Sequence, residues 1–234
     1  MSAATVAAIL PLFNEGAPIA DLVRRVPPEI AETFVCDDGS TDDGPDHAAR
    51  AGATVLRLPH RGAGAAIRAG IHAARQRGHW AVVVMAGNGK DDPAESPRLI
   101  ARLRGGDDYV QGSRYLPGGT RENLPLARNL AIRGYSLAFR LMTGFPGTDV
   151  TNGFRAYRLS LFDDPRIRID QPWLDRYELE YYVHFKAITL RYRVSEVAVS
   201  KTYPRSGAYS KIRPFLDWWS IIRPTFLLWL RLRR

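Results

Sequence analysis

Short apolar runs alternate with longer amphipathic stretches through the first half of the chain. The apolar runs, rich in Val, Ile, Leu and Ala, predict strands at residues 5–10, 32–37, 53–58, 79–85 and 108–113. The stretches between them carry apolar residues at helical spacing and predict helices at about 17–26, 42–51, 63–77 and after Pro93. Because the runs lack strict apolar–polar alternation, we expect mostly parallel strands that helices cover on both faces. This order of elements predicts an α/β fold, a three-layer α/β/α sandwich with right-handed crossovers.

Beyond residue 115 the alternation weakens. The same patterns predict further helices at about 123–143 and 175–187, strands within 149–158 and 192–200, and a loop at 201–211. No stretch has the composition of a linker. We therefore expect one domain over 1–211, followed by a helix over 212–234.

Polar clusters follow each of the five strands predicted in the first half. In chain order they are PLFNE (11–15), DDGSTDDG (37–44), HRGAGAA (60–66), AGNGKDDP (86–93) and GSRY (112–115). The carboxyl ends of parallel strands lie along one edge of a sheet, where α/β proteins bind their ligands. We therefore expect these five segments to form one binding site.

Composition and charge narrow the range of partners. Hydrophobic residues make up 45% and charged residues 24% of the chain, as in a folded domain. The formal net charge of +9 favours an anionic partner, such as a phosphorylated substrate, an acidic membrane surface or nucleic acid. Nucleic acid fits poorly, because the basic residues follow strand-end loops and form no recognition motif. The single cysteine, Cys36, allows no intrachain disulfide and predicts a reducing, cytoplasmic location.

The stretch at 212–234 is aromatic and aliphatic and ends in arginines. A helix that spans a bilayer needs about 20 largely apolar residues, and Asp217, Arg223 and Pro224 interrupt this one. The stretch also contains three tryptophans: Trp218, Trp219 and Trp229. Tryptophans beside arginines suit an amphipathic helix in the membrane interface. We predict peripheral contact with the inner face of the membrane; packing on the domain or on a second copy is the alternative.

The ends of the first two predicted strands carry oxygen acceptors. Pro11 fixes the turn that leaves the first strand, and Asn14 and Glu15 can accept hydrogen bonds from a base or ribose. A helix cap by Asn14 explains that residue nearly as well. Asp37 and Asp38 point to opposite sides of a strand end. One of them can therefore face a ligand while the other braces the loop.

PLFNE and VCDDGSTD together resemble the opening signature of the family 2 glycosyltransferases, whose GT-A fold is a Rossmann-like α/β/α sandwich. The resemblance implies that these motifs hold the base and ribose of a nucleotide-diphosphate sugar, UDP- or GDP-linked. The matching positions are Pro11, Phe13, Glu15, Asp37 and Asp38. HRGAGAA keeps two spaced glycines of the family, Gly62 and Gly64, with His60 in place of an Asn, and implies that Gly64 contacts the donor. A dinucleotide-binding fingerprint is the rival interpretation, and it fails because its third glycine is missing.

Ala86-Gly87-Asn88 stands where the family has Asp-x-Asp, whose two carboxylates hold Mg²⁺ or Mn²⁺ on the donor pyrophosphate. Such ions prefer anionic oxygen ligands. Ala86 offers none, and Asn88 offers only a neutral amide oxygen. A metal is therefore disfavoured, and we assign none. We expect Gly87 and Asn88 to contact the donor.

Lys90 follows two positions later, and we hypothesise that its ammonium replaces the metal ion. At about 4 Å from a phosphate oxygen, one charge is worth roughly 4 kcal/mol at an effective dielectric near 20. That is enough to affect departure of the leaving group. Asp91 and Asp92 are a weaker alternative as metal ligands; capping of the helix that follows suits them better.

GSRYLPGGTRENLPLARN resembles polyprenyl-phosphate sugar transferases of the dolichol-phosphate mannose synthase type. The resemblance implies that Arg114 and Arg128 bind the acceptor phosphate and act in catalysis, and guanidinium groups suit phosphate. DVTNGFRAYR matches a further element of the family and adds Asp149 to the catalytic residues. The same element assigns Asn152 and Arg155 to acceptor binding.

RSGAYSK keeps the family's Arg and Lys as Arg205 and Lys211, which the resemblance places on a loop that closes on the donor phosphates. We therefore expect residues 1–115 to form the nucleotide-sugar half and 116–211 the acceptor half of an inverting glycosyltransferase.

A polyprenyl phosphate acceptor supplies its own anionic nucleophile and needs positioning rather than a strong base. A hydroxyl acceptor needs a carboxylate base, for which Asp149, Glu178 and Glu180 are candidates. A soluble enzyme acting on a hydroxyl and a non-catalytic nucleotide-sugar-binding protein are the alternatives.

Overall fold

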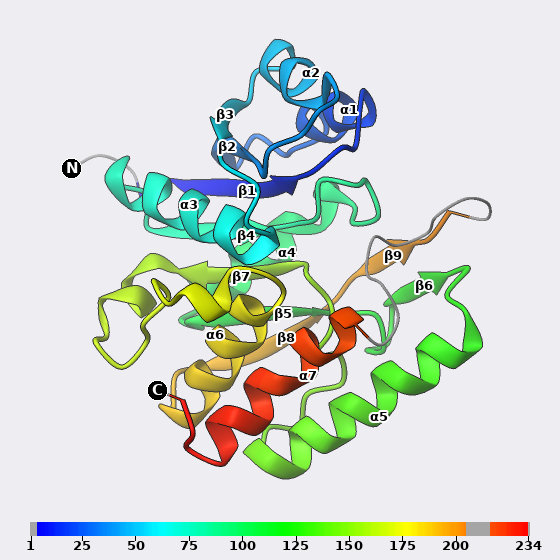
Figure 1. The fold of residues 1–234 in the computed structure, drawn as a ribbon, viewed down its shortest axis with the longest axis vertical. Coiled ribbons are helices and arrows are strands. Elements are labelled where there is room, and N and C mark those ends of the chain that lie inside the picture. The colour runs from blue at the N-terminus through cyan, green and yellow to red at the C-terminus, as the bar shows by residue number, and fades with distance from the viewer. Residues whose placement is uncertain (1–3, 205–215, 234) are drawn as a thin grey trace.

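The computed structural model describes residues 4–204 and 216–233. Within these ranges seven strands form one central sheet (Figure 1). In the order in which they pair, they are β3 (Thr54–Arg57), β2 (Ile30–Asp37), β1 (Val6–Leu12), β4 (Ala81–Val84), β7 (Arg155–Arg158), β5 (Tyr109–Ser113) and β8 (Val194–Ala198). Only β7 runs antiparallel to its neighbours among these pairs. The predicted mostly parallel sheet is confirmed.

Helices cover both faces of the sheet, so the predicted three-layer sandwich is confirmed as well. On one face lie α1 (Pro18–Arg24), α2 (Gly44–Arg50) and α4 (Ser96–Arg104). On the other lie α3 (Ala63–Gln76), α5 (Leu126–Thr143), α6 (Glu178–Thr189) and α7 (Leu216–Trp229). In β1, Ile9 belongs to one core and Ala8 and Leu10 to the other, and all three are fully buried. Burial on both faces explains why these strands lack alternation.

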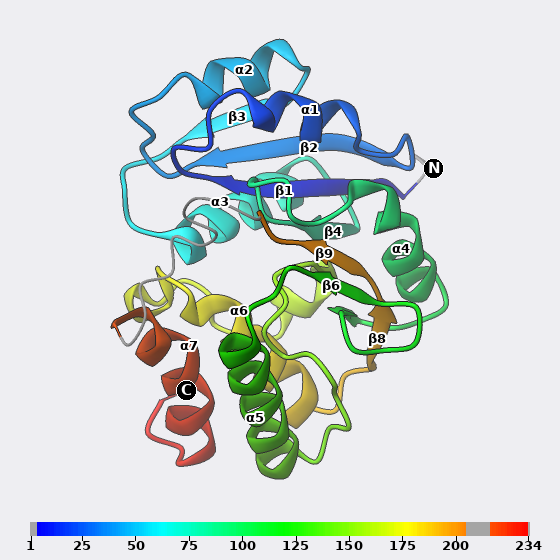
Figure 2. The ribbon, with the colours of Figure 1, turned by 90° about the vertical axis from the view of Figure 1, so that its right-hand side faces the viewer.

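The second half departs from the prediction at one point. The strand expected within 192–200 is β8, and the loop expected at 201–211 begins instead with a second strand, β9 (Ser200–Thr202), which pairs in parallel with β6 (Thr120–Glu122) (Figure 2). At Val199 the chain changes its pairing from β5 to β6. The Val199 N–H donates to the Ser113 carbonyl of β5, and the Val199 carbonyl accepts the N–H of Thr120 in β6. All three residues of β6 are exposed, so no apolar pattern could reveal it.

The terminal helix α7 packs on the domain and also exposes aromatic residues. Arg223 binds the buried carboxylate of Glu178 in α6, and the Tyr135 hydroxyl of α5 donates to the Ile221 carbonyl over 3.2 Å. Trp219 remains 60% exposed. Packing on the domain is therefore confirmed for this helix, and its contact with a membrane stays a prediction. No helix within the described ranges is long and apolar enough to cross a bilayer.

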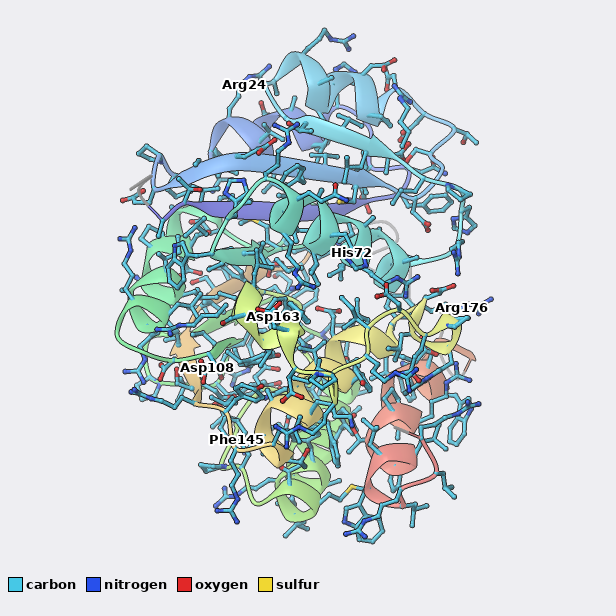
Figure 3. The ribbon with its side chains drawn as sticks, turned by 90° about the vertical axis from the view of Figure 1, so that its left-hand side faces the viewer. Arg24, His72, Asp108, Phe145, Asp163 and Arg176 are labelled. Atoms are coloured by element: carbon cyan, nitrogen blue, oxygen red, sulfur yellow. The ribbon has the colours of Figure 1, made fainter. Side chains whose placement is uncertain are left out.

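Charged pairs join α3 to the segment that precedes α6 (Figure 3). His72 Nε2 lies 2.7 Å from Asp170, and Arg75 binds Asp163. These pairs attach the segment before α6 to α3.

Candidate active site

Hydrogen bonds join the loop after β1 to the loop after β2. Asn14 has a left-handed backbone, with φ 49°, and donates its N–H to Ser40 Oγ over 3.0 Å. Its side-chain oxygen accepts the N–H of Thr41 over 2.8 Å. Ala17 is the N-cap of α1, so the interpretation of Asn14 as a helix cap is wrong. These bonds fix the segment that carries Glu15.

Asp38 braces the loop that follows β3. Its Oδ1 accepts the N–H groups of Arg61 and Gly62 over 2.8 and 3.0 Å, and His60 Nδ1 lies 2.9 Å from its Oδ2. The carboxylate is buried. Phe13 stacks on the His60 ring, with 4.4 Å between centroids. One of the two adjacent aspartates was expected to brace the loop, and Asp38 does so.

Asp37 is also buried, and its Oδ1 accepts the N–H of Ser40 over 2.9 Å. The ends of β1 and β2 therefore present two carboxylates and an aromatic pair in a fixed arrangement. Carboxylates accept hydrogen bonds from sugar hydroxyls, and an aromatic face stacks with a base. This part of the site suits a nucleoside.

Gly64 lies where another segment of the chain approaches α3. Its N–H donates to the Arg176 carbonyl over 2.6 Å, and a Cβ at this position would stand 2.1 Å from the Leu174 oxygen. Asp175, between those residues, accepts from both Arg61 and Arg68. The glycine is therefore required by packing against 174–176. The donor contact predicted for Gly64 stays a prediction.

The loop after β4 is compact. Gly87 packs against the Pro11 carbonyl, which a Cβ would approach to 2.6 Å. The Asn88 side-chain oxygen accepts the N–H of Lys90 over 3.3 Å, and Asp91 accepts the N–H of Ala86 over 3.2 Å. The loop therefore closes on itself around Asn88.

The two aspartates that follow have separate roles. Asp92 accepts the Ala94 N–H over 3.1 Å, so the expected capping is confirmed there, and it also pairs with Arg25 at 2.6 Å. Asp91 is 1% exposed and pairs with Lys201 at 2.7 Å.

These residues do not fit a divalent metal site of the usual kind. Ala86 has no ligand atom, and both aspartates are already neutralised by cations. Over the described ranges, no group of three or more His, Cys, Asp or Glu side chains is placed to hold a metal ion. Mg²⁺ and Mn²⁺ take anionic oxygens, which this loop commits elsewhere.

Lys90 and Arg128 approach the same aromatic ring. The Lys90 Nζ lies 5.9 Å and the Arg128 Cζ 5.7 Å from the centroid of Tyr203. Burial, and then the charges of Lys201 and Arg128, lower the pKa of the half-buried Lys90 to about 8, while the charges of Glu15 and Asp91 act in the opposite direction. Cations at this spacing create a strongly positive field, which attracts a polyanion.

Arg114, by contrast, is buried and bound by protein groups. Its Nε and Nη2 donate to the two Asp149 oxygens over 2.6 and 2.7 Å. Nη2 also donates to the Thr151 hydroxyl over 2.7 Å, and Nη1 donates to the Tyr203 hydroxyl. Arg114 thus holds the ring that Lys90 and Arg128 approach. The bidentate pair leaves Asp149 poorly placed to take a proton.

Asn152 and Arg155 lie deeper still, and both are fully buried. The Arg155 guanidinium donates to the carbonyls of Asn152, Val150 and Glu180 over 2.8 to 3.1 Å. Burial of a guanidinium requires such partners. The placement favours a structural role, and the acceptor contacts predicted for these two residues stay predictions.

The two glutamates proposed as bases differ. Glu178 is fully buried and binds Arg223. Burial raises the pKa of Glu180, and its Oε1, 3.3 Å from Arg155 Nε, has no hydrogen-bond partner among the described residues. Glu180 is therefore the better placed of the two.

Two residues of the site were missed in the sequence, Lys201 and Tyr203. They belong to a polar stretch directly before the RSGAYSK motif, and that adjacency was the available signal. Arg205 and Lys211 of the motif lie outside the described residues.

Known proteins resemble this chain in sequence and in fold. The profile of glycosyl transferase family 2 matches residues 7–164. The polyprenol monophosphomannose synthase of Mycolicibacterium smegmatis is 32% identical over 211 residues, covering 85% of this chain and 78% of the relative. The undecaprenyl-phosphate mannosyltransferase of Micrococcus luteus is 32% identical over 200 residues, covering 82% and 81%.

A solved structure, glucosyl-3-phosphoglycerate synthase from Mycobacterium tuberculosis with Mn²⁺, UDP and product, superposes with a TM-score of 0.71. It is 21% identical, covering 100% of this chain and 82% of its own, so it shows the shared GT-A fold. The family profile covers more than half of the chain, including the strand-end loops described above. The chain is a glycosyltransferase and belongs to glycosyl transferase family 2.

Proposed function

We propose that this enzyme transfers a sugar from a nucleotide-diphosphate sugar to a polyprenyl phosphate, with inversion and without a divalent metal ion. The observation that carries the proposal is the placement of Lys90 and Arg128 against Tyr203, at the end of β4. By the family resemblance noted in the sequence, this loop corresponds to the Asp-x-Asp segment that holds a metal ion. Here two side-chain cations gather instead.

The donor would lie along the ends of β1, β2 and β4. Its base and ribose would meet Phe13, Glu15 and the pair Asp37 and Asp38, and its diphosphate would face Lys90. Binding of the diphosphate would raise the Lys90 pKa again, because an anion stabilises the ammonium.

The reaction then needs no metal and no general base. An oxygen of the acceptor phosphate attacks the anomeric carbon from the side opposite the diphosphate. The bond from that carbon to the diphosphate oxygen breaks, and the nucleoside diphosphate leaves with the bonding electrons. A single displacement inverts the anomeric centre. Lys90 stabilises the charge that develops on the leaving oxygen, the kind of electrostatic assistance that supplies most of many enzymes' rate enhancement.

The acceptor phosphate would bind Arg128, in the first turn of α5. Arg114 would act through Tyr203 and the Asp149 pair and is better described as a positioning residue than as a phosphate ligand. The two relatives named above are a polyprenol monophosphomannose synthase and an undecaprenyl-phosphate mannosyltransferase, and this supports a polyprenyl phosphate acceptor.

Two helices offer a surface for the membrane in which such an acceptor resides. Four leucines on one face of α5 are each more than half exposed: Leu126, Leu130, Leu137 and Leu141. On α7, Trp219 and Trp229 are also more than half exposed. Exposed apolar faces with aromatic residues and nearby arginines suit the membrane interface. The sequence prediction assigned this role to the terminal helix alone.

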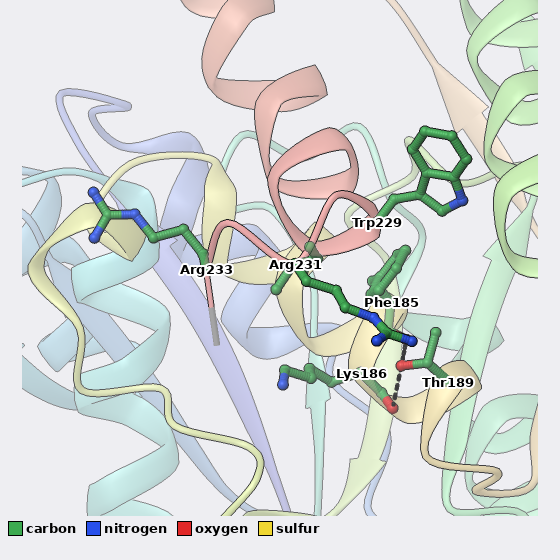
Figure 4. A pocket seen from close by; sticks show the side chains of 7 residues that line it. Phe185, Lys186, Thr189, Trp229, Arg231 and Arg233 are labelled. Carbon is green, nitrogen blue, oxygen red and sulfur yellow. Dashed lines mark hydrogen bonds between the residues drawn. The ribbon is translucent and has the colours of Figure 1, made fainter.

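A cleft of about 460 Å³ between α6 and α7 adds positive charge to this surface (Figure 4). Its described lining residues include no carboxylate and are Phe185, Lys186, Thr189, Leu228, Trp229, Arg231 and Arg233. Anionic headgroups attract basic side chains at a membrane surface. We extend the proposal to peripheral binding at the cytoplasmic face of an acidic membrane.

The experiment is a screen of UDP-, GDP- and dTDP-sugars against a polyprenyl phosphate and against water-soluble hydroxyl acceptors, with products identified by mass spectrometry in excess EDTA. We expect a glycosyl polyprenyl phosphate. Transfer to a hydroxyl alone would favour Glu180 as a base. Activity lost in EDTA and restored by Mn²⁺ would reject the metal-free mechanism, and binding of donor without turnover would make the chain a nucleotide-sugar-binding protein.

A further inference from the structure

A buried ion pair joins three segments that are far apart in the sequence. The Lys201 Nζ of β9 lies 2.7 Å from Asp91 Oδ1, in the loop after β4, and 3.0 Å from Asn152 Oδ1, before β7. Lys201 is 8% and Asp91 1% exposed. A buried charge is stable only where a partner and hydrogen bonds compensate it. Each of these two groups therefore requires the other.

The pair also sets the shape of the loop that presents Lys90. The second Asp91 oxygen accepts the Ala86 N–H over 3.2 Å, so Asp91 links both ends of the loop. On the far side, the Thr202 N–H donates to the Lys90 carbonyl over 3.1 Å. The backbone on both sides of Lys90 is thus attached to β9 through Lys201 and its neighbour.

The same pair occupies the carboxylate that could most readily attract a metal. Asp91 and the Asn152 side-chain oxygen converge on one cation, the Lys201 ammonium. A carboxylate and an amide oxygen, with diphosphate oxygens from the donor, are the ligands that Mg²⁺ and Mn²⁺ accept. Lys201 fills the position where such an ion would find them.

We infer that Lys201 is a positioning residue that acts as a built-in counterion: it holds the 86–91 loop in the shape that presents Lys90, and it keeps Asp91 from recruiting a divalent ion. The inference rests on the proposed role of Lys90 at the leaving group. It concerns how that role is maintained, and it assigns no contact between Lys201 and the substrate.

The test compares Lys201→Met with Lys201→Arg, Asp91→Asn and the double variant Lys201→Met/Asp91→Asn. Circular dichroism first establishes that each variant is folded. We expect Lys201→Met to lose at least about tenfold in kcat in EDTA, with a smaller change in donor KM, because the loop no longer presents Lys90 correctly. Lys201→Arg should retain most activity, because it keeps the charge beside Asp91.

Titration with Mn²⁺ supplies the second measurement. In Lys201→Met, Mn²⁺ should tighten binding of UDP or GDP at least about fivefold in calorimetry, because Asp91 and Asn152 become available. The double variant should lose that response, and the wild type should not show it. Arg25→Met, which breaks the exposed pair with Asp92, is the matched control and should behave as the wild type.

The possible results separate the two proposals. An unchanged kcat in folded Lys201→Met, or equal Mn²⁺ responses in the single and double variants, would overturn the inference. If Lys201→Met does not fold, Asp91→Asn and Lys201→Arg still test the inference. Asp91→Asn breaks the ion pair and Lys201→Arg keeps it, so equal kcat values in these two variants would contradict the inference. A wild type without transferase activity would refute the proposed function, while nucleotide and Mn²⁺ binding would still report on Lys201.

Discussion

The two parts of the candidate site differ in charge and in the way they are held. At the ends of β1 and β2 the functional groups are carboxylates, and Asp38 accepts backbone N–H groups of the next loop over 2.8 to 3.0 Å. At the end of β4 they are cations, and Lys90 and Arg128 approach one aromatic ring. The first part is acidic and suits ribose hydroxyls. The second is basic and suits phosphates.

This difference separates binding from reaction. Hydrogen bonds to a base and ribose are equally strong in the ground state and in the transition state, so they set donor affinity. Additional negative charge develops on the leaving diphosphate oxygen as the sugar departs, so we expect cations near it to affect the rate of the chemical step more than donor affinity. Changes in the two parts should therefore affect different kinetic constants.

The largest effect should follow replacement of Lys90. Lys90→Met removes the charge expected at the leaving group, and we expect kcat to fall by about 10²- to 10³-fold with a smaller change in donor KM. Lys90→Arg keeps the positive charge on a guanidinium group of different shape and should retain more activity than Lys90→Met. Steady-state kinetics in EDTA measure both.

The control for Lys90 is a lysine outside the site. Lys186, on α6, lines the cleft at α7, and Lys186→Met should leave kcat with a soluble acceptor analogue unchanged. If Lys90→Met retains the wild-type kcat, the basic part of the site does not stabilise the leaving group.

Substitutions in the acidic part of the site should change the donor KM. Asp38→Ala leaves the part-buried N–H groups of Arg61 and Gly62 without their acceptor, which costs at most about 1–3 kcal/mol in loop stability. We expect the donor KM to rise about tenfold or more, while kcat changes little. Asp46→Ala, which removes an exposed pair with Arg57, is the control. A loss confined to kcat would contradict the assignment of donor affinity to the acidic part of the site.

The fold was largely predictable because its strands are buried on both faces. Runs such as 5–10 and 79–85 are continuous and apolar, and each became a strand of the central sheet. β6 and β9 could not be predicted, because they are short, polar and stabilised by pairing with each other. Their existence depends on where Val199 leaves the main sheet, which is a tertiary contact.

The acidic part of the site could be predicted better than the basic part for a similar reason. Asp37 and Asp38 act on neighbouring loops, so local motifs describe them. Arg114, whose binding to the acceptor phosphate stays a prediction, pairs with Asp149, 35 residues away. Apart from its place just before the RSGAYSK motif, Lys201 has no signal in the sequence, since its partner Asp91 lies 110 residues earlier. Whether a cation faces a ligand or a buried carboxylate is decided by such distant contacts.

The pH dependence of donor binding should reveal the basic part directly. In the free protein, burial and the neighbouring charges of Lys201 and Arg128 lower the pKa of Lys90 to about 8. A bound diphosphate raises that pKa, so binding takes up a proton above pH about 8, and affinity falls as pH rises, by at most about tenfold per unit. Calorimetry of UDP or GDP in buffers of different ionisation enthalpy measures this uptake. Lys90→Arg should abolish it, and proton release by the wild type would contradict the assignment.

The smallest effect should appear far from both parts, on the exposed face of α5. Leu137 and Leu141 are 56% and 78% exposed, so Leu137→Glu/Leu141→Glu should leave folding intact. Withdrawing two leucines from a membrane interface costs about 1 kcal/mol or more, so sedimentation with anionic vesicles should fall about threefold to tenfold. Arg24→Ala/Arg50→Ala lowers the net charge equally at the other end of the molecule and is the control for charge. Equal losses in both variants would mean that long-range electrostatics alone brings the protein to the membrane, and that the leucines do not enter it.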